Sequence, residues 1–161
     1  MSHPSTSGYW GTFPLRELVE EVCQPLEPRF AAQSIQTVID IPSNQAITAD
    51  RELLCRAVRN LVLNAMDVMP EGGSLIATSA ADPSAVELEI ADTGPALSDE
   101  TRHQALDPQL APEREVTGWG LAVVLRIAEL HGGSVSATNC PEGGVAFTLR
   151  LPRPVALEAA A

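Results

Sequence analysis

Four stretches of the chain are predicted to be helical, and three of them repeat their apolar residues at intervals of three or four, which is the spacing of one face of an α-helix. The first covers residues 14–32, where two internal prolines must kink or end the helix. The second begins after Asp50, a residue type that suits the N-cap, and ends before Pro70. The last two are a short helix at residues 98–106 and an apolar one at 121–130.

Five further segments have the alternation or the β-branched content of strands: residues 35–41, 74–80, 85–91, 134–138 and 145–151. The turn residues Asp82 and Pro83 predict an antiparallel hairpin between the second and third of them. One strand therefore stands alone after the first helix, and the other four follow as two pairs, with helices between these groups. This order predicts an α+β fold, a two-layer sandwich with a mixed, mostly antiparallel sheet of about five strands and helices on one face.

The two ends of the chain differ from the segments between them. Residues 1–12 are rich in Ser, Gly, Thr and Pro, which predicts a flexible N-terminal arm. Residues 153–161 predict a C-terminal tail, so the expected domain covers residues 13–152. A chain of 161 residues that is 45% hydrophobic is long enough for one buried core.

The net charge of the chain limits the classes of partner that it is expected to bind. Ten basic residues face 21 acidic ones, for a formal charge of −11, and all ten are arginine. Binding to nucleic acid or to an anionic membrane surface needs a cationic patch, so neither is expected. An anionic ligand would have to be held by arginine, by backbone N–H groups or through a metal ion.

The cysteines and the apolar runs predict a reduced, cytoplasmic protein. Cys23, Cys55 and Cys140 have neither the paired spacing of metal ligands nor the density of a disulfide framework. No apolar run approaches the ~20 residues needed to cross a bilayer, and the N-terminus lacks the charged and apolar parts of a signal peptide. Direct membrane insertion is therefore not expected.

Polar residues interrupt the second helix at helical spacing. Asn60 and Asn64 are four residues apart and share a face, which Asp67 continues one turn later. Asparagine is a poor helix former, so two in mid-helix do not serve helix stability. One interpretation is a solvated polar stripe. The other is a row of oxygen ligands, a type that suits Mg²⁺ because this ion takes few protein oxygens and keeps phosphates and water.

Two glycine-containing turns are further candidates for chemistry. Asp92 and Gly94 lie in the turn that follows a predicted strand, where Asp and Gly are also ordinary turn residues. Alternatively, Asp92 accepts a hydrogen bond from a ligand amine, and Gly94 lets the ligand approach the backbone. Gly118 and Gly120 precede a predicted helix, whose N-terminal N–H groups favour an anion.

Taken together and in this order, three runs resemble the ATP-binding catalytic domain of sensor histidine kinases. The runs are NLVLNAMDVMPEGG, ADTGPALSDE and GWGLAVVLRIAELHGGSVSATNCPEGGVAFTLRLP. That domain belongs to the Bergerat (GHKL) superfamily, shared with DNA gyrase, the MutL mismatch-repair proteins and the heat-shock chaperone ATPases. The resemblance covers about residues 15–152 and is closest to the nitrogen-regulation type of sensor kinase.

The resemblance implies roles for particular positions. Asn64 matches the Mg²⁺ ligand, and Asn60 matches the catalytic position where hydrolysing relatives carry a glutamate. Asp92 matches the residue that recognises the adenine amino group, and Gly94 lies beneath the ring. The full set of implied nucleotide-binding positions is Asn64, Asp67, Asp92, Gly94, Arg114, Thr117, Gly118, Gly120 and Leu121.

The resemblance also implies an activity and partners. Domains of this family bind Mg²⁺ and ATP under a lid and present the γ-phosphate to a histidine on a separate dimeric helical domain. The phosphoryl group then passes to a response regulator. The three histidines of this chain do not lie in a long amphipathic helix, and His131, before two glycines, suits a helix C-cap. The predicted enzyme class is therefore a protein-histidine kinase acting on a histidine elsewhere.

Several positions depart from the family pattern. Ala96 replaces the last glycine of the first glycine box, which a backbone with φ < 0 tolerates and one with φ > 0 does not. In the lid, residues 107–121, Glu113 replaces a lysine and reverses a charge. Val145 replaces a threonine beside Asp92. These changes motivate the alternative of a degenerate docking module that binds nucleotide weakly or not at all. An anti-sigma-type serine kinase is a third, less favoured hypothesis.

Overall fold

A five-stranded sheet forms one layer of the molecule in the computed structural model, which describes residues 10–107 and 121–153. The strand order is β2-β4-β5-β7-β6, with β2 parallel to β4 and the other pairs antiparallel. The predicted mixed, mostly antiparallel sheet is thus confirmed. The bounds are β2 (Ile35–Asp40), β4 (Gly73–Ala81), β5 (Ala85–Asp92), β6 (Ser134–Asn139) and β7 (Val145–Pro152).

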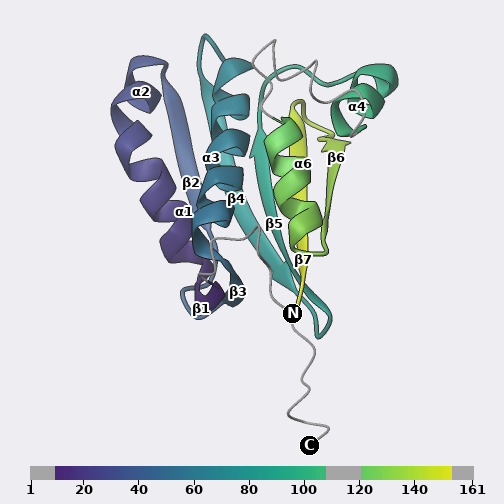
Figure 1. The fold of residues 1–161 in the computed structure, drawn as a ribbon. Coiled ribbons are helices and arrows are strands. Elements are labelled where there is room, and N and C mark those ends of the chain that lie inside the picture. Colours follow the sequence, from purple (N-terminus) through teal and green to yellow (C-terminus); the bar gives the residue numbers. More distant parts are fainter. Residues whose placement is uncertain (1–9, 108–120, 154–161) are drawn as a thin grey trace, which may run out of the picture.

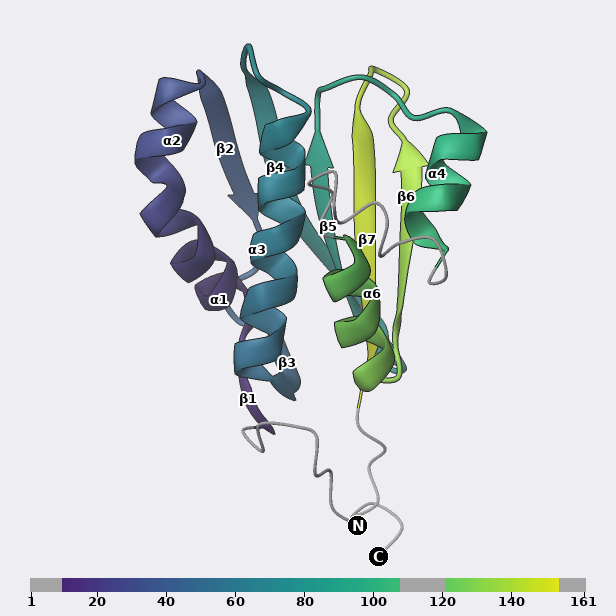
Figure 2. The same cartoon turned by 45° about the horizontal axis from the view of Figure 1, so that its top comes forward.

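The helices form the second layer, on one face of the sheet (Figures 1 and 2). The two prolines act as the sequence predicts, because the first helical region is divided into an α-helix, a 3-10 turn and a second α-helix. The bounds are α1 (Leu15–Cys23), η1 (Gln24–Leu26), α2 (Glu27–Ala32), α3 (Arg51–Asp67), α4 (Asp99–Leu106) and α6 (Leu121–Leu130).

The core lies between the two layers. Leu54, Val58 and Leu61 on one stripe of α3 are at most 1% exposed, and alternate residues of β5, such as Leu88 and Ile90, are equally buried. Each such side chain contributes about 2 kcal/mol through burial. The apolar stripe of α3, with its helical period, and the apolar face of β5, with its two-residue period, thus form one apolar interface.

A second, two-stranded sheet was missed by the sequence analysis. Strand β1 (Trp10–Pro14) pairs antiparallel with β3 (Ala46–Asp50). Residues 10–12 therefore belong to a strand and not to the predicted arm, whose remaining residues 1–9 lie outside the described part. The pairing joins distant segments. No residue of β1 is fully buried and buried residues of β3 do not alternate regularly, so neither strand has a recognisable period.

His131 connects the two-stranded sheet to α3 and α6. Its Nε2 accepts a hydrogen bond from the Asp50 backbone N–H (3.1 Å), so its Nδ1 donates to the Ile127 carbonyl (2.8 Å). The Trp10 ring lies 4.6 Å from the imidazole, between centroids. The predicted C-cap role of His131 is confirmed, with the addition that the ring also fixes the start of α3.

No described helix is long and apolar enough to cross a membrane.

Candidate functional site

Asp92 is a buried carboxylate at the end of β5. Its side chain is 3% exposed, and its Oδ1 accepts hydrogen bonds from the backbone N–H groups of Gly94 (2.9 Å) and Val145 (3.3 Å). Burial raises the pKa of the carboxyl above its ordinary range, and these two donors oppose that effect. Both donors reach the same oxygen. Although Val145 replaces the expected threonine, its backbone N–H still bonds to Asp92.

Two glycines approach the backbone closely around Asp92. Gly144 has φ +93°, and a Cβ at this position would overlap the Asp92 carbonyl oxygen and lie 2.9 Å from the Thr93 Cα. A Cβ at Gly94 would lie 2.6 Å from the Val68 carbonyl oxygen, at the C-terminal end of α3. Gly94 therefore serves close packing, and it brings the turn after β5 against the last turn of α3.

The three candidate site residues of α3 differ in exposure. Asn64 is only 5% exposed, Asn60 is half-buried, and Asp67 is exposed. Local desolvation raises the pKa of Asp67, and the nearby charge of Arg29 opposes this. Asn64 precedes Val68 by four residues, or about 6 Å of helix, so it lies at the end of α3 that contacts Gly94. The structure thus brings Asn64, Gly94 and Asp92 to one end of the helical layer.

Asn139 fixes the loop that follows Gly94, a role that the sequence analysis missed. Its Oδ1 accepts from the Leu97 N–H (2.9 Å), and its Nδ2 donates to the Leu97 carbonyl (2.8 Å). Ala96 lies in this loop and is not among the described non-glycine residues with positive φ. The replaced glycine is therefore tolerated there. Asn139 gave no signal in the sequence because Asn before a turn is ordinary.

Helix α6 packs beside α3 (Figures 1 and 2). Since His131, at the end of α6, contacts Asp50, at the start of α3, the two helices run antiparallel. The start of α6 therefore lies toward the end of α3 that carries Asn64, and Leu121 is fully buried there. The other predicted residues of this region, Arg114, Thr117, Gly118 and Gly120, lie outside the described residues.

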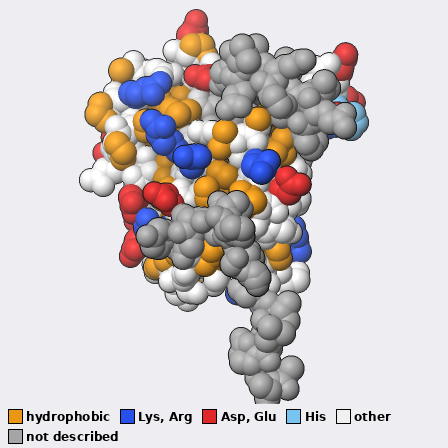
Figure 3. All heavy atoms as spheres, viewed as in Figure 1, with side chains coloured by type: hydrophobic (Ala, Val, Ile, Leu, Met, Phe, Trp, Pro, Cys, Tyr) orange, Lys and Arg blue, Asp and Glu red, His pale blue; other side chains and the backbone are white. Residues whose placement is uncertain are grey.

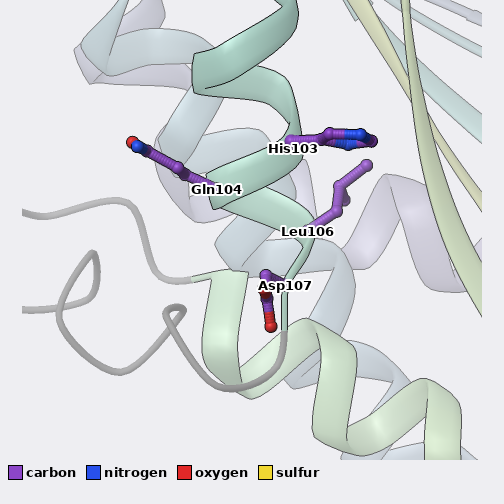
Figure 4. A pocket seen from close by; sticks show the side chains of 4 residues that line it. All are labelled: His103, Gln104, Leu106 and Asp107. Atoms are coloured by element: carbon purple, nitrogen blue, oxygen red, sulfur yellow. The ribbon is translucent and has the colours of Figure 1, made fainter.

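A hollow of about 390 Å³ lies at the end of α4, lined by His103, Gln104, Leu106 and Asp107 (Figure 4). Asp107 is the first residue of the segment that aligns with the lid of sensor kinases. Since α4 packs against α6, this hollow lies beside the helix that begins at Leu121. It contains neither Asn64 nor Asp92 among its described lining residues.

The described residues suit Mg²⁺ only in combination with a ligand. No group of three or more His, Cys, Asp or Glu side chains among them is placed to hold a metal ion. Mg²⁺ is commonly bound by one or two protein oxygens together with phosphates, and the amide of Asn64 is a donor of that kind. The described residues therefore fit an Mg²⁺ ion that is also bound by phosphate oxygens, and not one that is held by protein side chains alone.

Residues 49–155 match the family described as histidine kinase-, DNA gyrase B- and HSP90-like ATPases. The chain belongs to this family. Among curated relatives, the signal transduction histidine-protein kinase BaeS of Escherichia coli is 29% identical over 84% of this chain. Sensor histidine kinase ZraS of Klebsiella oxytoca is 31% identical over 86% of it. The chain spans 30% of the length of each of these relatives.

Solved structures agree with the fold. The catalytic domain of histidine kinase ThkA superposes with a TM-score of 0.80 at 26% identity, covering 89% of this chain and 95% of that one. Full-length ShkA in complex with AMPPNP gives a TM-score of 0.78 at 25% identity, covering 94% of this chain and 32% of that one. The predicted catalytic-domain fold of sensor histidine kinases is thus confirmed, and the nitrogen-regulation subtype stays a prediction.

Proposed function

We propose that this chain binds Mg²⁺ and ATP at the end of the helical layer that carries Asp92, Gly94 and Asn64. It then presents the γ-phosphate to a histidine on a separate dimeric helical domain, which passes the phosphoryl group to a response regulator. One observation carries the proposal: Asp92 is a buried carboxylate whose position is fixed by two backbone donors on one oxygen. Its other oxygen is the acceptor that we assign to the adenine amine.

The chemistry of Asp92 predicts a preference for adenine. An ionised carboxylate only accepts hydrogen bonds, and adenine offers an exocyclic amine where guanine has a carbonyl oxygen. A guanine at the same position would place that oxygen against a buried negative charge, which costs free energy without a compensating hydrogen bond. The close approach of Gly94 to Val68 keeps this turn at the end of α3, beside Asn64.

The asparagines of α3 favour transfer to a protein histidine over hydrolysis. We assign Asn64 as the Mg²⁺ ligand, and the bound ion supplies charge neutralisation to the phosphates. An amide has no useful pKa, so Asn60 does not remove a proton from water. We assign Asp67, Arg114, Thr117, Gly118, Gly120 and Leu121 to the phosphate and lid region, where backbone N–H groups at the start of α6 favour an anion.

Two relatives support the nucleotide and response-regulator parts of this proposal. ShkA has been solved in complex with AMPPNP, a nucleotide, and ThkA in complex with the response regulator TrrA. The ThkA complex superposes on this chain with a TM-score of 0.77 at 25% identity, covering 90% of this chain and 42% of that one. A nucleotide ligand and a response-regulator partner are therefore the chemistry and the protein class that we assign to this chain.

Calorimetric titration with a non-hydrolysable ATP analogue, with and without Mg²⁺, tests the proposal. We expect weak, Mg²⁺-dependent binding, because Glu113 reverses the charge of the lid lysine, and no binding of the matching GTP analogue. Asn64→Ala is expected to lower the Mg²⁺ enhancement about tenfold, whereas Asn44→Ala, in an exposed loop, leaves it unchanged. Absence of heat and of any thermal shift at millimolar nucleotide would instead favour the degenerate docking module.

A further inference from the structure

Strand β2 is an open edge of the five-stranded sheet. It pairs with β4 on one side and with no described strand on the other. Proteins commonly protect such edges with lysine, proline or a bulge, because unpaired backbone groups accept a further strand. The segment Ile35–Asp40 contains neither lysine nor proline, and Val38 is 47% exposed. The described part of the chain therefore leaves the outer side of β2 without a partner strand.

A groove of about 580 Å³ runs along this edge. Thr37 and Ile39 of β2 form one wall, and the helical segments from α1 to α2 form the other. The volume lies in the range of ordinary ligand clefts. The residues from the helical wall are Glu17, Glu20, Glu21, Cys23, Gln24 and Glu27.

The charges of the groove select its ligand. Glu20 and Glu21 form ion pairs with Arg16 (3.1 Å) and Arg51 (2.7 Å). Glu17 and Glu27 form no salt bridge among the described residues, so they leave net negative charge at the groove. Figure 3 shows acidic side chains gathered over α1 with a basic side chain among them, while further arginines lie across the centre of the helical layer. A basic ligand is favoured, and an anionic one is repelled.

Two other occupants are less suited to the groove. A metal ion is disfavoured because no three acidic, cysteine or histidine side chains among the described residues are placed to bind one. Covalent chemistry at Cys23 is disfavoured because burial and the charge of Glu27 raise its pKa to about 11, which keeps the thiol protonated. The open strand, in contrast, offers hydrogen bonds to another peptide backbone.

We propose that the groove between α1 and β2 binds an extended basic segment of another protein, which adds a strand to β2. The sequence outside the described residues at either end, 1–9 and 154–161, contains no lysine or arginine, so it does not supply the basic residues. Thr37 and Ile39 line the groove, and strand alternation points Val38 to the opposite face. The fitting segment therefore alternates basic residues, facing the glutamates, with apolar residues beside Val38.

A short blocked peptide of alternating lysine and valine is the probe for this site. We expect it to bind this chain and to slow amide exchange within residues 35–40. A peptide with glutamate in place of lysine is expected not to bind. A peptide N-methylated on the face that pairs with β2 is also expected not to bind, because it lacks the strand donors. Equal binding of the methylated peptide, or protection elsewhere on the chain, would overturn the proposal.

Charge reversal supplies the matched test. The double variant Glu17→Lys with Glu27→Lys is expected to weaken binding of the lysine peptide about tenfold at low salt, and less at high salt. Glu129→Lys on α6, also exposed but outside the groove, is the control and is expected to retain binding. Thermal melts of both variants report folding. A folded double variant with wild-type affinity would exclude the glutamates as the recognition element.

Discussion

Asp50 and Asp92 are two buried aspartates that each end a strand, and only one of them belongs to the candidate site. Asp50 is fully buried at the end of β3, where its carboxylate accepts from the Leu53 N–H (3.2 Å) as the N-cap of α3. Its backbone N–H is bound by His131. Asp92 is 3% exposed at the end of β5, with both of its backbone donors on Oδ1.

The difference lies in the origin of their partners. Asp50 caps a helix that starts at the next residue, so its carboxylate meets a local capping requirement. Asp92 is held by Gly94 in its own turn and by Val145 in a distant strand, and no helix begins there. A buried carboxylate that meets no capping requirement of the backbone is a candidate for ligand binding. Exposure alone does not separate the two residues.

Gly144→Ala is expected to give the largest effect, because it disturbs a close glycine–backbone contact that Asp92 has and that no described glycine makes with Asp50. Positive φ alone costs about 1–3 kcal/mol for a residue with a Cβ. Gly143→Ala shares the positive φ (+110°), but its Cβ would meet nothing within 4 Å. We expect chemical denaturation to show a loss of about 3 kcal/mol or more for Gly144→Ala and about 1.5 for Gly143→Ala. Equal losses would show that the overlap with the Asp92 carbonyl does not matter.

Asp92→Asn tests the ligand role directly. The amide keeps an acceptor for Gly94 and Val145 but places an N–H₂ group where the carboxylate would accept from adenine. We expect calorimetry to show an affinity for the ATP analogue about 100-fold lower, or about 2.7 kcal/mol. The unfolding free energy should change by less than about 1 kcal/mol, since the backbone bonds remain. A variant that is folded and binds normally would remove Asp92 from the site.

Asp50 is expected to show the opposite result. Asp50→Ala removes the N-cap and should lower the unfolding free energy by about 2 kcal/mol, measured by denaturant melts. Asp50→Asn is the control, because asparagine caps helices as well as aspartate does. Nucleotide affinity of the folded fraction should be unchanged in both variants. If a fully folded Asp50 variant bound nucleotide more weakly than the wild type, Asp50 would also contribute to the nucleotide site, and the proposed difference between the two aspartates would be wrong.

The smallest effect concerns pH. Burial raises the pKa of Asp92 when the chain is folded, so the ionised carboxylate costs stability above that pKa. As pH falls through the raised pKa, the folded state binds a proton first. The unfolding free energy of the wild type should therefore rise relative to Asp92→Asn, until the unfolded carboxyl also protonates. Affinity for the ATP analogue should fall in the same range, because the protonated carboxyl loses its charge. If the wild type and Asp92→Asn showed the same dependence on pH, the effect would come from a group other than Asp92.

Much of the fold follows from local pattern. The apolar stripe and N-cap of α3 predicted that helix almost to the residue, since burial of one face and capping are both local requirements. Pro25 and Pro28 predicted the break between α1 and α2 for the same reason. The pairing of β1 with β3 was not predictable, because its register depends on segments over 30 residues apart that carry little apolar signal.

The candidate site was predicted in part. Asp92, Gly94 and Asn64 were all identified from the sequence, and the structure places them toward one end of the helical layer. Their roles as nucleotide and metal ligands stay predictions. The two hydrogen bonds between Asn139 and Leu97 were not predicted. The hydrogen bond from the Val145 backbone N–H to Asp92 was not predicted either, because a backbone donor is present whichever side chain the residue carries.

The sequence by itself determined the helices, the strands of the main sheet, the family and the charge of a lysine-free chain. Each of these follows from neighbouring residues or from ordered motifs. Only the tertiary structure decided that Asp92 is held across strands, and that the glutamates of α1 face an open sheet edge. These distinctions depend on contacts between distant segments, because packing and hydrogen bonding, and not residue type, decide what a buried carboxylate or an exposed strand does.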